Sequence, residues 1–257
     1  LTAASGMKAQ QMQVDTIANN IANVNTHGFK QSRLSFRSLL YETLREPGAP
    51  SAANSIDASG LQIGTGTEVA GSLKMFKQGD LEQTGGPLDL ALQGEGFFAV
   101  QIPNGELRYT RSGSLRRDET GQIVTAEGYR LANAPTIPSD SVLVVIAEDG
   151  TLSSTSREDQ VPSQLGQIQI TRFSNPAGLK AQGGNYFTPT ASSGQPQQTN
   201  PTQNGAGSIH QGYLERSNVA TVDELVALIV AQRNYEVNSR AIRVSDEMLQ
   251  QVSQLIR

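Results

Sequence analysis

The chain lacks cysteine and tryptophan altogether, and it has only two histidines among its 257 residues. Without cysteine it can form neither a disulfide bond nor a thiolate metal site. His27 and His210 alone are too few for the ligand sets that usually hold zinc. We therefore expect no metal site and no cofactor, and the redox compartment stays undetermined.

Long apolar runs and a basic excess are also missing. No segment approaches about eighteen consecutive apolar residues, the length that suggests a membrane span. No basic segment with an apolar core opens the sequence, so we expect no cleavable secretory signal. The formal net charge is −4, whereas a phosphate-binding surface usually shows as a basic excess. We therefore expect no nucleic-acid partner and no membrane insertion.

Both ends of the chain carry apolar residues at helical spacing, and we call these residues the helix seam. Five of those at the C-terminal end recur at every seventh residue. A seven-residue apolar repeat buries itself only against another helix. The seam therefore predicts a coiled coil, and it comprises Val14, Ile17, Ile21, Val24, Leu225, Leu228, Tyr235, Ile242, Leu249 and Ile256.

Polar residues interrupt the C-terminal seam at Gln232, Ser239, Asp246 and Ser253. This mixture of polar and apolar residues favours contacts with several neighbouring helices through partly hydrated interfaces. It is less typical of a single pair of helices with an entirely apolar interface. We therefore favour packing between copies of the chain, with an intramolecular hairpin of the two terminal helices as the alternative.

The helix ends have their own signals. The first helix is expected to run to about Asn25 and to stop at a left-handed Gly28, with Val24 contacting Phe29 as in a Schellman motif. For the last helix, Thr221 as N-cap and Glu224 as N3 fit a capping box, and the helix then continues to the end of the chain.

Asparagines near the end of the first helix lie at 19, 20 and 23. Asn19 and Asn23 lie four residues apart, so a helix would place them on one strip. This strip is either a solvated face or a row of hydrogen-bonding groups against another chain. We favour the second interpretation.

The middle of the chain has a period of two with frequent turn signals from about residue 73 to residue 187. Asn104-Gly105 and Asp149-Gly150 predict hairpins between antiparallel strands. Residues 30–44 suit either a helix or an extended chain, and residues 46–66 read as extended or irregular. Residues 190–207 read as a polar return linker. The fold class is therefore α+β.

The sequence gives no positive sign of catalysis. Gly94–Ala99 fits the dinucleotide pattern G-x-G-x-x-A, but that motif requires a helix next, and the following residues read as a strand. The two glycines are expected to mark a turn or bulge. Neither histidine is flanked by a nucleophile signature, and no carboxylate pair suggests acid–base work. We expect no catalytic residue and no enzyme.

Four sequence blocks resemble the family of bacterial flagellar rod and hook proteins. The first, ANNIANVNTHGFK at 18–30, resembles the family signature; the others are GEGFFAV at 94–100, the block at 109–131 and the block at 211–242. The resemblance marks an assembly motif whose members are Asn19, Asn20, Asn23, Thr26, Gly28, Phe29 and Lys30. LLYETLREPGA and GLQIGTG are similar to the family's distal rod members, and they mark intermediate-region residues Pro47, Gly48, Gly60, Leu61, Ile63 and Gly64.

The resemblance implies a three-part organisation. Residues 1–30 and 217–257 would form a coiled-coil core domain around an export channel. Residues 31–72 and 206–216 would form an extended intermediate region, and residues 73–205 a mainly antiparallel β outer domain. Several more residues are expected before Leu1, and the terminal helices are expected to fold only on assembly.

The resemblance also implies the function and the partners. The subunits would polymerise helically into the distal rod, a rigid hollow drive shaft that transmits torque from motor to hook. The implied partners are other copies, proximal rod proteins, the hook protein, the outer-membrane and peptidoglycan ring proteins and the flagellar export apparatus. The implied location is the basal body, spanning the periplasm, reached without a cleaved signal peptide.

Two alternatives remain open. A proximal rod or hook subunit of the same family would differ in the intermediate region. A secreted β-domain adhesin or enzyme with coiled-coil ends would need a clustered polar pocket, which the sequence does not suggest.

Overall fold

The computed structural model describes residues 2–45, 50–52, 55–56, 60–157 and 161–255. The described residues form two long α-helices and antiparallel strands, which confirms the α+β class. The chain divides into two compact units. The helix–ribbon unit contains residues 1–22, 32–74 and 220–257, and the β unit contains residues 23–31 and 75–219. The expected three-part division stays a prediction.

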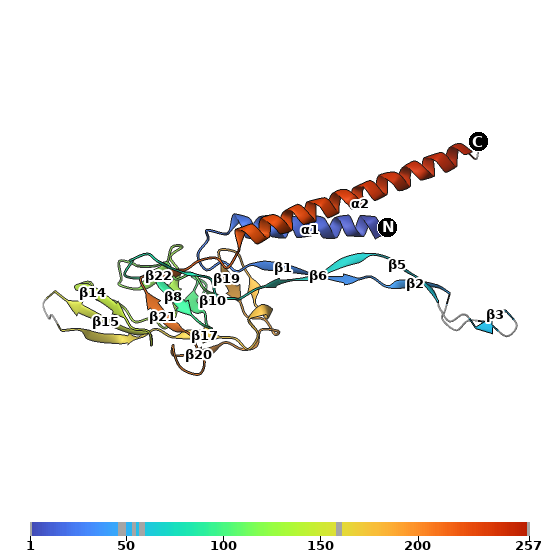
Figure 1. The fold of residues 1–257 in the computed structure, drawn as a ribbon. Helices are drawn as coiled ribbons and strands as arrows, with labels where there is room; N and C mark the ends of the chain where they lie inside the picture. The colour runs from blue at the N-terminus through green and yellow to red at the C-terminus, as the bar shows by residue number, and fades with distance from the viewer. Residues whose placement is uncertain (1, 46–49, 53–54, 57–59, 158–160, 256–257) are drawn as a thin grey trace. The chain divides into compact units, whose positions relative to one another are not determined.

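Two helices from opposite ends of the sequence lie side by side in the helix–ribbon unit (Figure 1). These are α1 (Thr2–Ala22) and α2 (Thr221–Leu255). They run antiparallel, because Asn20 bonds to Glu224 while a Cβ on Gly6 would lie 3.0 Å from the Asn238 amide nitrogen. The intramolecular pairing that the sequence left as the alternative is therefore present.

The chain between the helices forms a two-stranded antiparallel ribbon (Figure 1). Its three successive strand pairs are β1 (Ser32–Ser38) with β6 (Thr67–Lys74), β2 (Tyr41–Arg45) with β5 (Leu61–Gly64) and β3 (Pro50–Ala52) with β4 (Ser55–Ile56). The chain after residue 31 is thus extended, not helical. The described part of 46–66, which reads as extended or irregular in sequence, is mostly strand.

Helix α1 packs against the base of this ribbon. The Thr67 backbone N–H donates to Ser5 Oγ at 3.3 Å. Gly66 has a φ of +126°, and a Cβ there would lie 2.1 Å from the same hydroxyl oxygen. The glycine therefore permits a close approach between ribbon and helix.

The β unit is built around a seven-stranded antiparallel sheet with strand order β11-β12-β13-β9-β10-β19-β18. In chain order its strands are β9 (Phe98–Gln101), β10 (Leu107–Thr110), β11 (Leu115–Arg117), β12 (Ile123–Thr125), β13 (Arg130–Leu131), β18 (Lys180–Ala181) and β19 (Tyr186–Thr188). Asn104-Gly105 joins β9 to β10, which confirms the first predicted hairpin.

Smaller antiparallel sheets complete the β unit, together with the 3₁₀ turn Pro176–Gly178. They are β14 (Ser141–Ile146), β15 (Thr151–Ser156) and β16 (Ser163–Gln167) in one sheet, and the pairs β17 (Ile170–Arg172) with β20 (Gln197–Thr199), β8 (Leu90–Gln93) with β21 (Ser208–Gln211) and β7 (Leu81–Gln83) with β22 (Tyr213–Glu215). Asp149-Gly150 joins β14 to β15, so the second predicted hairpin is also confirmed.

The residues read as a polar return linker, 190–207, are part of the β unit. Strand β20 lies within them and pairs with β17, and Ser193 is fully buried. The linker prediction is therefore wrong. The polar composition arises because short side chains here bond to the backbone, as when Ser193 Oγ donates to the Thr190 carbonyl at 2.9 Å.

Two hydrophobic clusters form the core of the β unit. One is mostly aliphatic and includes Leu90, Leu92, Val100 and Ile209, all fully buried. The other is aromatic, with Phe97, Tyr109, Phe173, Leu179 and Phe187 at its centre. Its rings meet edge to face, for example Tyr109 and Phe173 at 4.9 Å between centroids, a favoured aromatic geometry.

Both helix-end predictions need correction. Helix α1 ends at Ala22, three residues early, because residues 23 to 28 form turns. Gly28 does have a left-handed φ of +71°, but its N–H donates to the Glu215 carbonyl and the Phe29 N–H to that of Thr26, so there is no Schellman motif. Asparagine is a poor helix former, and residues 19–25 contain four of them.

Helix α2 begins one residue earlier than a Thr221 cap would require. The Glu224 N–H donates to the carbonyl of Ala220, so Ala220 is the N-cap and Thr221 the first helical residue. The Glu224 carboxylate bonds to Asn20 instead. The capping-box prediction is therefore wrong in its positions, because the N-cap is Ala220 and Glu224 is the fourth helical residue.

Candidate functional site

Asn20 is the buried member of the assembly motif within the helix–ribbon unit. It is 1% exposed, and its Nδ2 donates to the Ser32 carbonyl at 2.9 Å and to Glu224 Oε2 at 3.2 Å. Its Oδ1 accepts from the Ser32 N–H at 2.9 Å. One side chain therefore joins the last turn of α1, the start of β1 and the first turn of α2. We call this contact the Asn20 node.

The two residues of the predicted asparagine strip, Asn19 and Asn23, lie in different environments. Asn19 is exposed on α1, whereas Asn23 lies in the turn beyond the helix and accepts a bond from the Thr26 hydroxyl at 3.2 Å. These two residues are therefore not on one helical face. Their contact with another chain stays a prediction.

The end of the motif, residues 28 to 30, lies in the core of the β unit. Gly28, Phe29 and Lys30 are all buried. A Cβ on Gly28 would lie 2.5 Å from the backbone nitrogen of Ser112, and L-residues rarely adopt the φ of this position. Only glycine therefore fits where this segment crosses the loop after β10.

A buried charge cluster surrounds this segment, and we call Lys30, Glu215 and Arg111 the ion cluster. Lys30 Nζ lies 2.6 Å from Glu215 Oε1 and donates to the Lys77 carbonyl at 2.8 Å. Arg111 Nε lies 2.9 Å from Glu215 Oε2, and the Gly79 N–H donates to Glu215 Oε1 at 2.9 Å. Each of the three charged side chains is at most 4% exposed.

The ion cluster holds two cations around one carboxylate. Burial lowers the pKa of the Lys30 ammonium below its ordinary value; Glu215 opposes this shift and Arg111 adds to it. Charges buried in this way persist only where they are paired and hydrogen-bonded. The cluster therefore ties residues 28–30 to the strands before α2.

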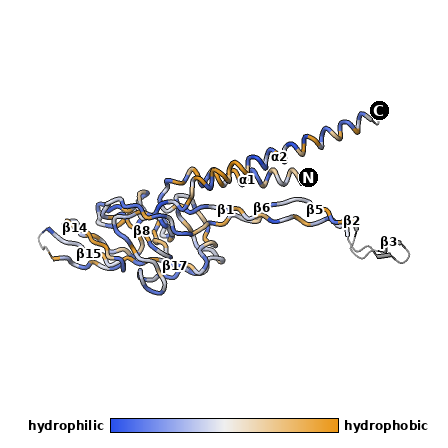
Figure 2. The backbone as a smooth tube through the Cα atoms, in the orientation of Figure 1, coloured by the Kyte–Doolittle hydropathy of each residue, from blue (hydrophilic) through white to orange (hydrophobic). Residues whose placement is uncertain are grey.

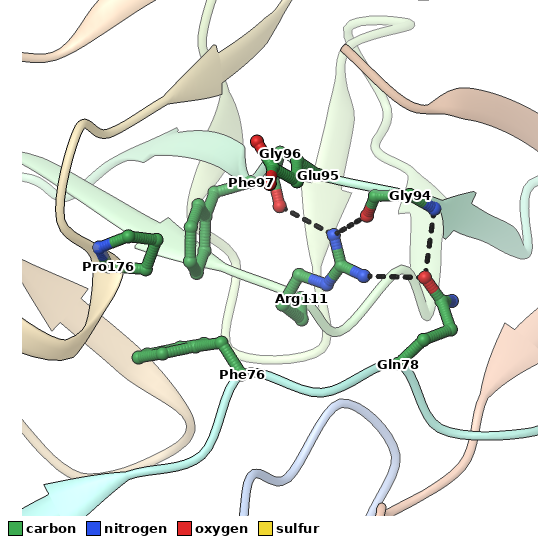
Figure 3. Close-up of a pocket in the computed structure, with 8 residues that line it drawn as sticks. All are labelled: Phe76, Gln78, Gly94, Glu95, Gly96, Phe97, Arg111 and Pro176. Atoms are coloured by element: carbon green, nitrogen blue, oxygen red, sulfur yellow. Dashed lines mark hydrogen bonds between the residues drawn. The ribbon is translucent and has the colours of Figure 1, made fainter. Parts of the chain in front are cut away.

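Arg111 also shapes the loop before β9, as Figure 3 shows. Its guanidinium donates to the carbonyls of Gly94 at 2.8 Å and Gly96 at 2.7 Å, and to Gln78 Oε1 at 3.2 Å. Gln78 Oε1 also accepts from the Gly94 N–H at 2.8 Å. A neighbouring cavity of about 260 Å³ has Phe76, Phe97 and Pro176 on its wall.

This loop carries the formal dinucleotide pattern. Its structure matches the other interpretation, a turn or bulge before a strand. Gly94 and Gly96 have φ values of +106° and +147°, and strand β9 follows instead of a helix. The backbone carbonyls of the loop point to Arg111. The glycines thus mark a turn before a buried strand, as the sequence predicts.

The helix seam is only partly covered. On α1, Ile17 is buried, Val14 and Ile21 are half-buried, and Val24 lies beyond the helix end. On α2, Leu228 and Ile242 are half-buried, while Leu225, Tyr235 and Leu249 are 46%, 42% and 68% exposed. Ile256 lies outside the described residues.

Val14 and Tyr235 are brought together by the pairing of α1 with α2. With Gln11, Gln232 and Glu236 they line a groove of about 530 Å³ along the two helices. Figure 2 shows that apolar residues are concentrated in the first half of α2. The seam therefore forms an intramolecular contact and also leaves apolar surface free on the described helices.

The intermediate-region residues lie in or beside the ribbon. Gly60 directly precedes β5, and Leu61, Ile63 and Gly64 belong to it; Pro47 and Gly48 lie outside the described residues. Leu61 and Ile63 are 52% and 50% exposed. A Cβ on Gly64 would lie 3.4 Å from the ring of Tyr41.

The sequence alone does not indicate the partners in the Asn20 node and the ion cluster: Ser32, Arg111, Glu215 and the tertiary contact of Glu224. Three of these lie in the sequence blocks that resemble the family. A charged residue inside an apolar strand, as in YLER, is a signal of buried pairing. Finding its partner requires the strand register, which the sequence alone does not provide.

Neither described helix has a window apolar enough for a bilayer crossing. Among the described residues, no cluster of three or more histidine or acidic side chains could hold a metal ion.

Comparisons with known proteins identify the class. Residues 1–30 match the family described as "Flagella basal body rod protein". Residues 91–154 match "Flagellar hook protein FlgE/F/G D1 domain", and residues 210–255 match "Flagellar basal body rod FlgEFG protein C-terminal".

Curated relatives named flagellar basal-body rod protein FlgG match nearly the whole chain. The relative from Borreliella burgdorferi is 45% identical over 250 residues, covering 96% of this chain and 94% of its own. The relative from Buchnera aphidicola subsp. Acyrthosiphon pisum is 44% identical over 251 residues, covering 98% of this chain and 96% of its own. That from Caulobacter vibrioides is 43% identical over 255 residues, covering 99% and 97%.

The matched segments include both terminal helices and the β unit. The chain belongs to the family of flagellar basal-body rod proteins. It is a structural subunit of the flagellar rod.

Proposed function

We propose that this chain builds the distal rod, polymerising helically into a rigid hollow shaft that transmits torque from motor to hook and encloses the export channel. The observation that carries this proposal is the apolar surface left uncovered on α2. Val222, Val226, Ile229, Val237 and Leu249 are each more than half exposed. Exposed apolar surface of this kind marks a site that a partner covers.

The ribbon supports the same proposal. A two-stranded ribbon is marginally stable by itself in water. Here Leu40, Tyr41 and Leu44 are each more than half exposed. In a polymer these side chains would lie against neighbouring copies, so that the ribbon clamps one subunit to the next and stiffens the shaft.

The role that this proposal assigns to each part of the chain follows the family resemblance. Residues 1–30 and 217–257 would form the coiled-coil core around the channel, and residues 31–72 and 206–216 the intermediate region. Residues 73–205 would face the outer-membrane and peptidoglycan rings. The neighbours along the axis would be proximal rod proteins and the hook protein, and the chain would perform no catalysis.

We also propose that the rod spans the periplasm and that the subunit reaches it through the flagellar export apparatus without a cleaved signal peptide. The rod is favoured over the hook because the three relatives described above, at 43–45% identity, are called rod proteins. A proximal rod or hook role is therefore the weaker alternative.

Ile242→Asp tests the seam in this function. Ile242 is half-buried on α2 near the start of α1, so a carboxylate there would disrupt the helix contact on which assembly depends. We expect the variant to lose motility and to be absent from isolated basal bodies. The β unit of the full chain should stay folded by near-ultraviolet circular dichroism. Normal rods built from this variant would contradict the seam assignment.

A further inference from the structure

Two Asn-Gly dipeptides occur in the chain, Asn104-Gly105 and Asn204-Gly205. The first forms the hairpin turn between β9 and β10, and the second lies in the loop after β20. Asparagine is a chemically labile residue. Before glycine it is open to attack by the next backbone nitrogen, because glycine has no side chain to hinder the approach. Both asparagines are exposed to water, so the local hydrogen bonds decide which of them reacts.

The reaction at such a dipeptide needs no co-reactant except water. The glycine N–H loses its proton to solvent, and the nitrogen forms a bond to the asparagine Cγ while Nδ2 takes up a proton and leaves as ammonia. Water then opens the succinimide ring at either carbonyl, which leaves aspartate or isoaspartate. Nothing is oxidised or reduced. The fold can therefore control the reaction through the glycine N–H and through the charge that its loss creates.

The hairpin turn protects Asn104 from this reaction. The Gly105 N–H donates to the Ile102 carbonyl at 2.9 Å, so solvent cannot take its proton unless that bond opens. The Asn104 Oδ1 accepts from the Glu106 N–H at 3.1 Å, which fixes the asparagine side chain. The Ile102 N–H donates to the Glu106 carbonyl at 3.1 Å and closes the turn. Attack at Asn104 would require all of these bonds to rearrange.

Asn204 lies in a loop without these restraints. Within the described part of the chain, neither the Asn204 side chain nor the Gly205 N–H has a hydrogen-bond partner. Asn204 and Gly205 have left-handed φ values of +51° and +75°, and both residues are exposed. Water can therefore reach the Gly205 N–H, and the asparagine side chain is free to turn toward the glycine nitrogen.

Arg172 on β17 supplies a positive charge at the reacting amide. Its Nη1 donates to the Asn204 carbonyl, which belongs to the same peptide group as the Gly205 nitrogen. A Cβ on Gly205 would lie 3.5 Å from the same Nη1. When the nitrogen loses its proton, the negative charge is shared with this carbonyl oxygen, and a fixed cationic donor stabilises it. Glu95 binds Nη2 of the guanidinium and so holds it against the loop.

We propose that Asn204 is a site of spontaneous deamidation, at which Arg172 promotes conversion to aspartate or isoaspartate while Asn104 stays intact. The product places a carboxylate beside the Glu95–Arg172 pair. Isoaspartate also adds one methylene to the backbone of a loop that is anchored to Glu95, because the Gly207 N–H donates to the Glu95 carbonyl at 2.8 Å. Since the ammonia is lost, the change accumulates with the age of the protein.

Peptide mapping of the purified full chain tests this assignment. The protein is kept in mildly alkaline buffer, either folded or in guanidinium chloride, and is digested with trypsin at intervals. Trypsin places the two sites in different peptides, 78–108 and 181–216. Mass spectrometry measures the replacement of NH by O, and fragment spectra separate Asn204 from Asn185 and Asn200. We expect Asn204 to react about ten-fold faster than Asn104 in the folded protein.

The denatured sample separates the effect of the fold from that of the sequence. Both sites are Asn-Gly, so in guanidinium chloride they should react at similar rates. Equal rates in the folded protein, or a faster reaction at Asn104, would overturn the proposal. The same ten-fold preference in the denatured chain would also overturn it, because the preference would then come from the sequence alone.

Variants of Arg172 measure the contribution of its charge. Arg172→Gln removes the charge, and Arg172→Lys keeps it. We expect Arg172→Gln to slow the reaction at Asn204 about five-fold and Arg172→Lys to restore most of the rate. Asn104 in the same molecule is the control, and its rate should not change. An unchanged rate at Asn204 in Arg172→Gln, or an equal change at both asparagines, would overturn the role of Arg172.

Discussion

At the residue scale, the ion cluster shows that the effect of one substitution depends on which charges remain. Glu215 is the only carboxylate between Lys30 and Arg111 in the described cluster. Removing the carboxylate leaves two buried cations close together. Removing Lys30 leaves the Arg111–Glu215 pair intact.

We therefore expect Glu215→Gln to destabilise the protein by about 3–5 kcal/mol, as when one partner of a buried pair is removed. Lys30→Met loses hydrogen bonds but leaves no unpaired charge, so its cost should be nearer 1–2 kcal/mol. Urea unfolding of the full chain, followed through tyrosine fluorescence, gives both values. Equal destabilisation by the two variants would mean that the charges do not act as a cluster.

Gly28 has two properties that require glycine: a left-handed φ and the close approach of another segment. Gly85 shares only the first property, so it serves as a matched control. Gly28 and Gly85 have nearly the same φ, +71° and +70°, but a Cβ would meet Ser112 at Gly28 and nothing within 4 Å at Gly85. Gly85→Ala should cost about 1–2 kcal/mol, the usual penalty for a left-handed alanine. Gly28→Ala should cost clearly more. Similar shifts in melting temperature for both variants would show that the close approach does not matter.

Part of the local structure of the assembly motif could be predicted from the residues. The tertiary partners of its side chains could not. The left-handed Gly28 follows from the local pattern, whereas the burial of Lys30 does not. The partners of Lys30 do not, because Glu215 is 185 residues away in sequence. That contact depends on how β7 pairs with β22, and charged residues in short strands do not specify a register.

At the element scale, the Asn20 node sets where α1 and α2 cross. Asn20→Ala leaves Glu224 and both backbone groups of Ser32 without their described partner. We expect a loss of about 1–3 kcal/mol, the cost of unsatisfied buried polar groups. Thermal unfolding monitored by circular dichroism measures it.

Asn234→Ala is the control, because Asn234 is exposed on α2. Alanine favours helix more than asparagine does, so this variant should be neutral or slightly stabilising. If both variants shift the melting temperature alike, the Asn20 node does not stabilise the helix pair.

The elements themselves were predictable to different degrees. Both helices and the two hairpins follow from periodicity and turn residues. The ribbon of β1, β2, β5 and β6 does not, because a two-stranded ribbon without a buried face has no hydrophobic alternation to reveal it. Strand β20 was missed for the same reason, since Gln197–Thr199 are polar.

At the scale of the whole molecule, the uncovered surfaces of α2 and of the ribbon share one explanation in assembly. Residues 46–60 can be replaced by Asn-Gly, a two-residue turn that would still allow β2 to pair with β5. We expect this shorter ribbon to give a more flexible, hook-like polymer, because less of it can clamp a neighbour. A replacement of equal length in glycine and serine separates length from sequence.

The bending stiffness of isolated rods, measured from electron micrographs as a persistence length, provides the readout. Unchanged stiffness in the shortened variant would remove this segment from the mechanism. Reduced stiffness in the shortened variant alone would assign the effect to length.

Electron cryotomography of flagellar motors in cells lacking this gene tests the central claim most directly. The account predicts a rod that begins at the inner membrane, stops short of the outer rings and carries no hook. Intact flagella, or a complete rod that lacks only the hook, would contradict the assignment to the distal rod.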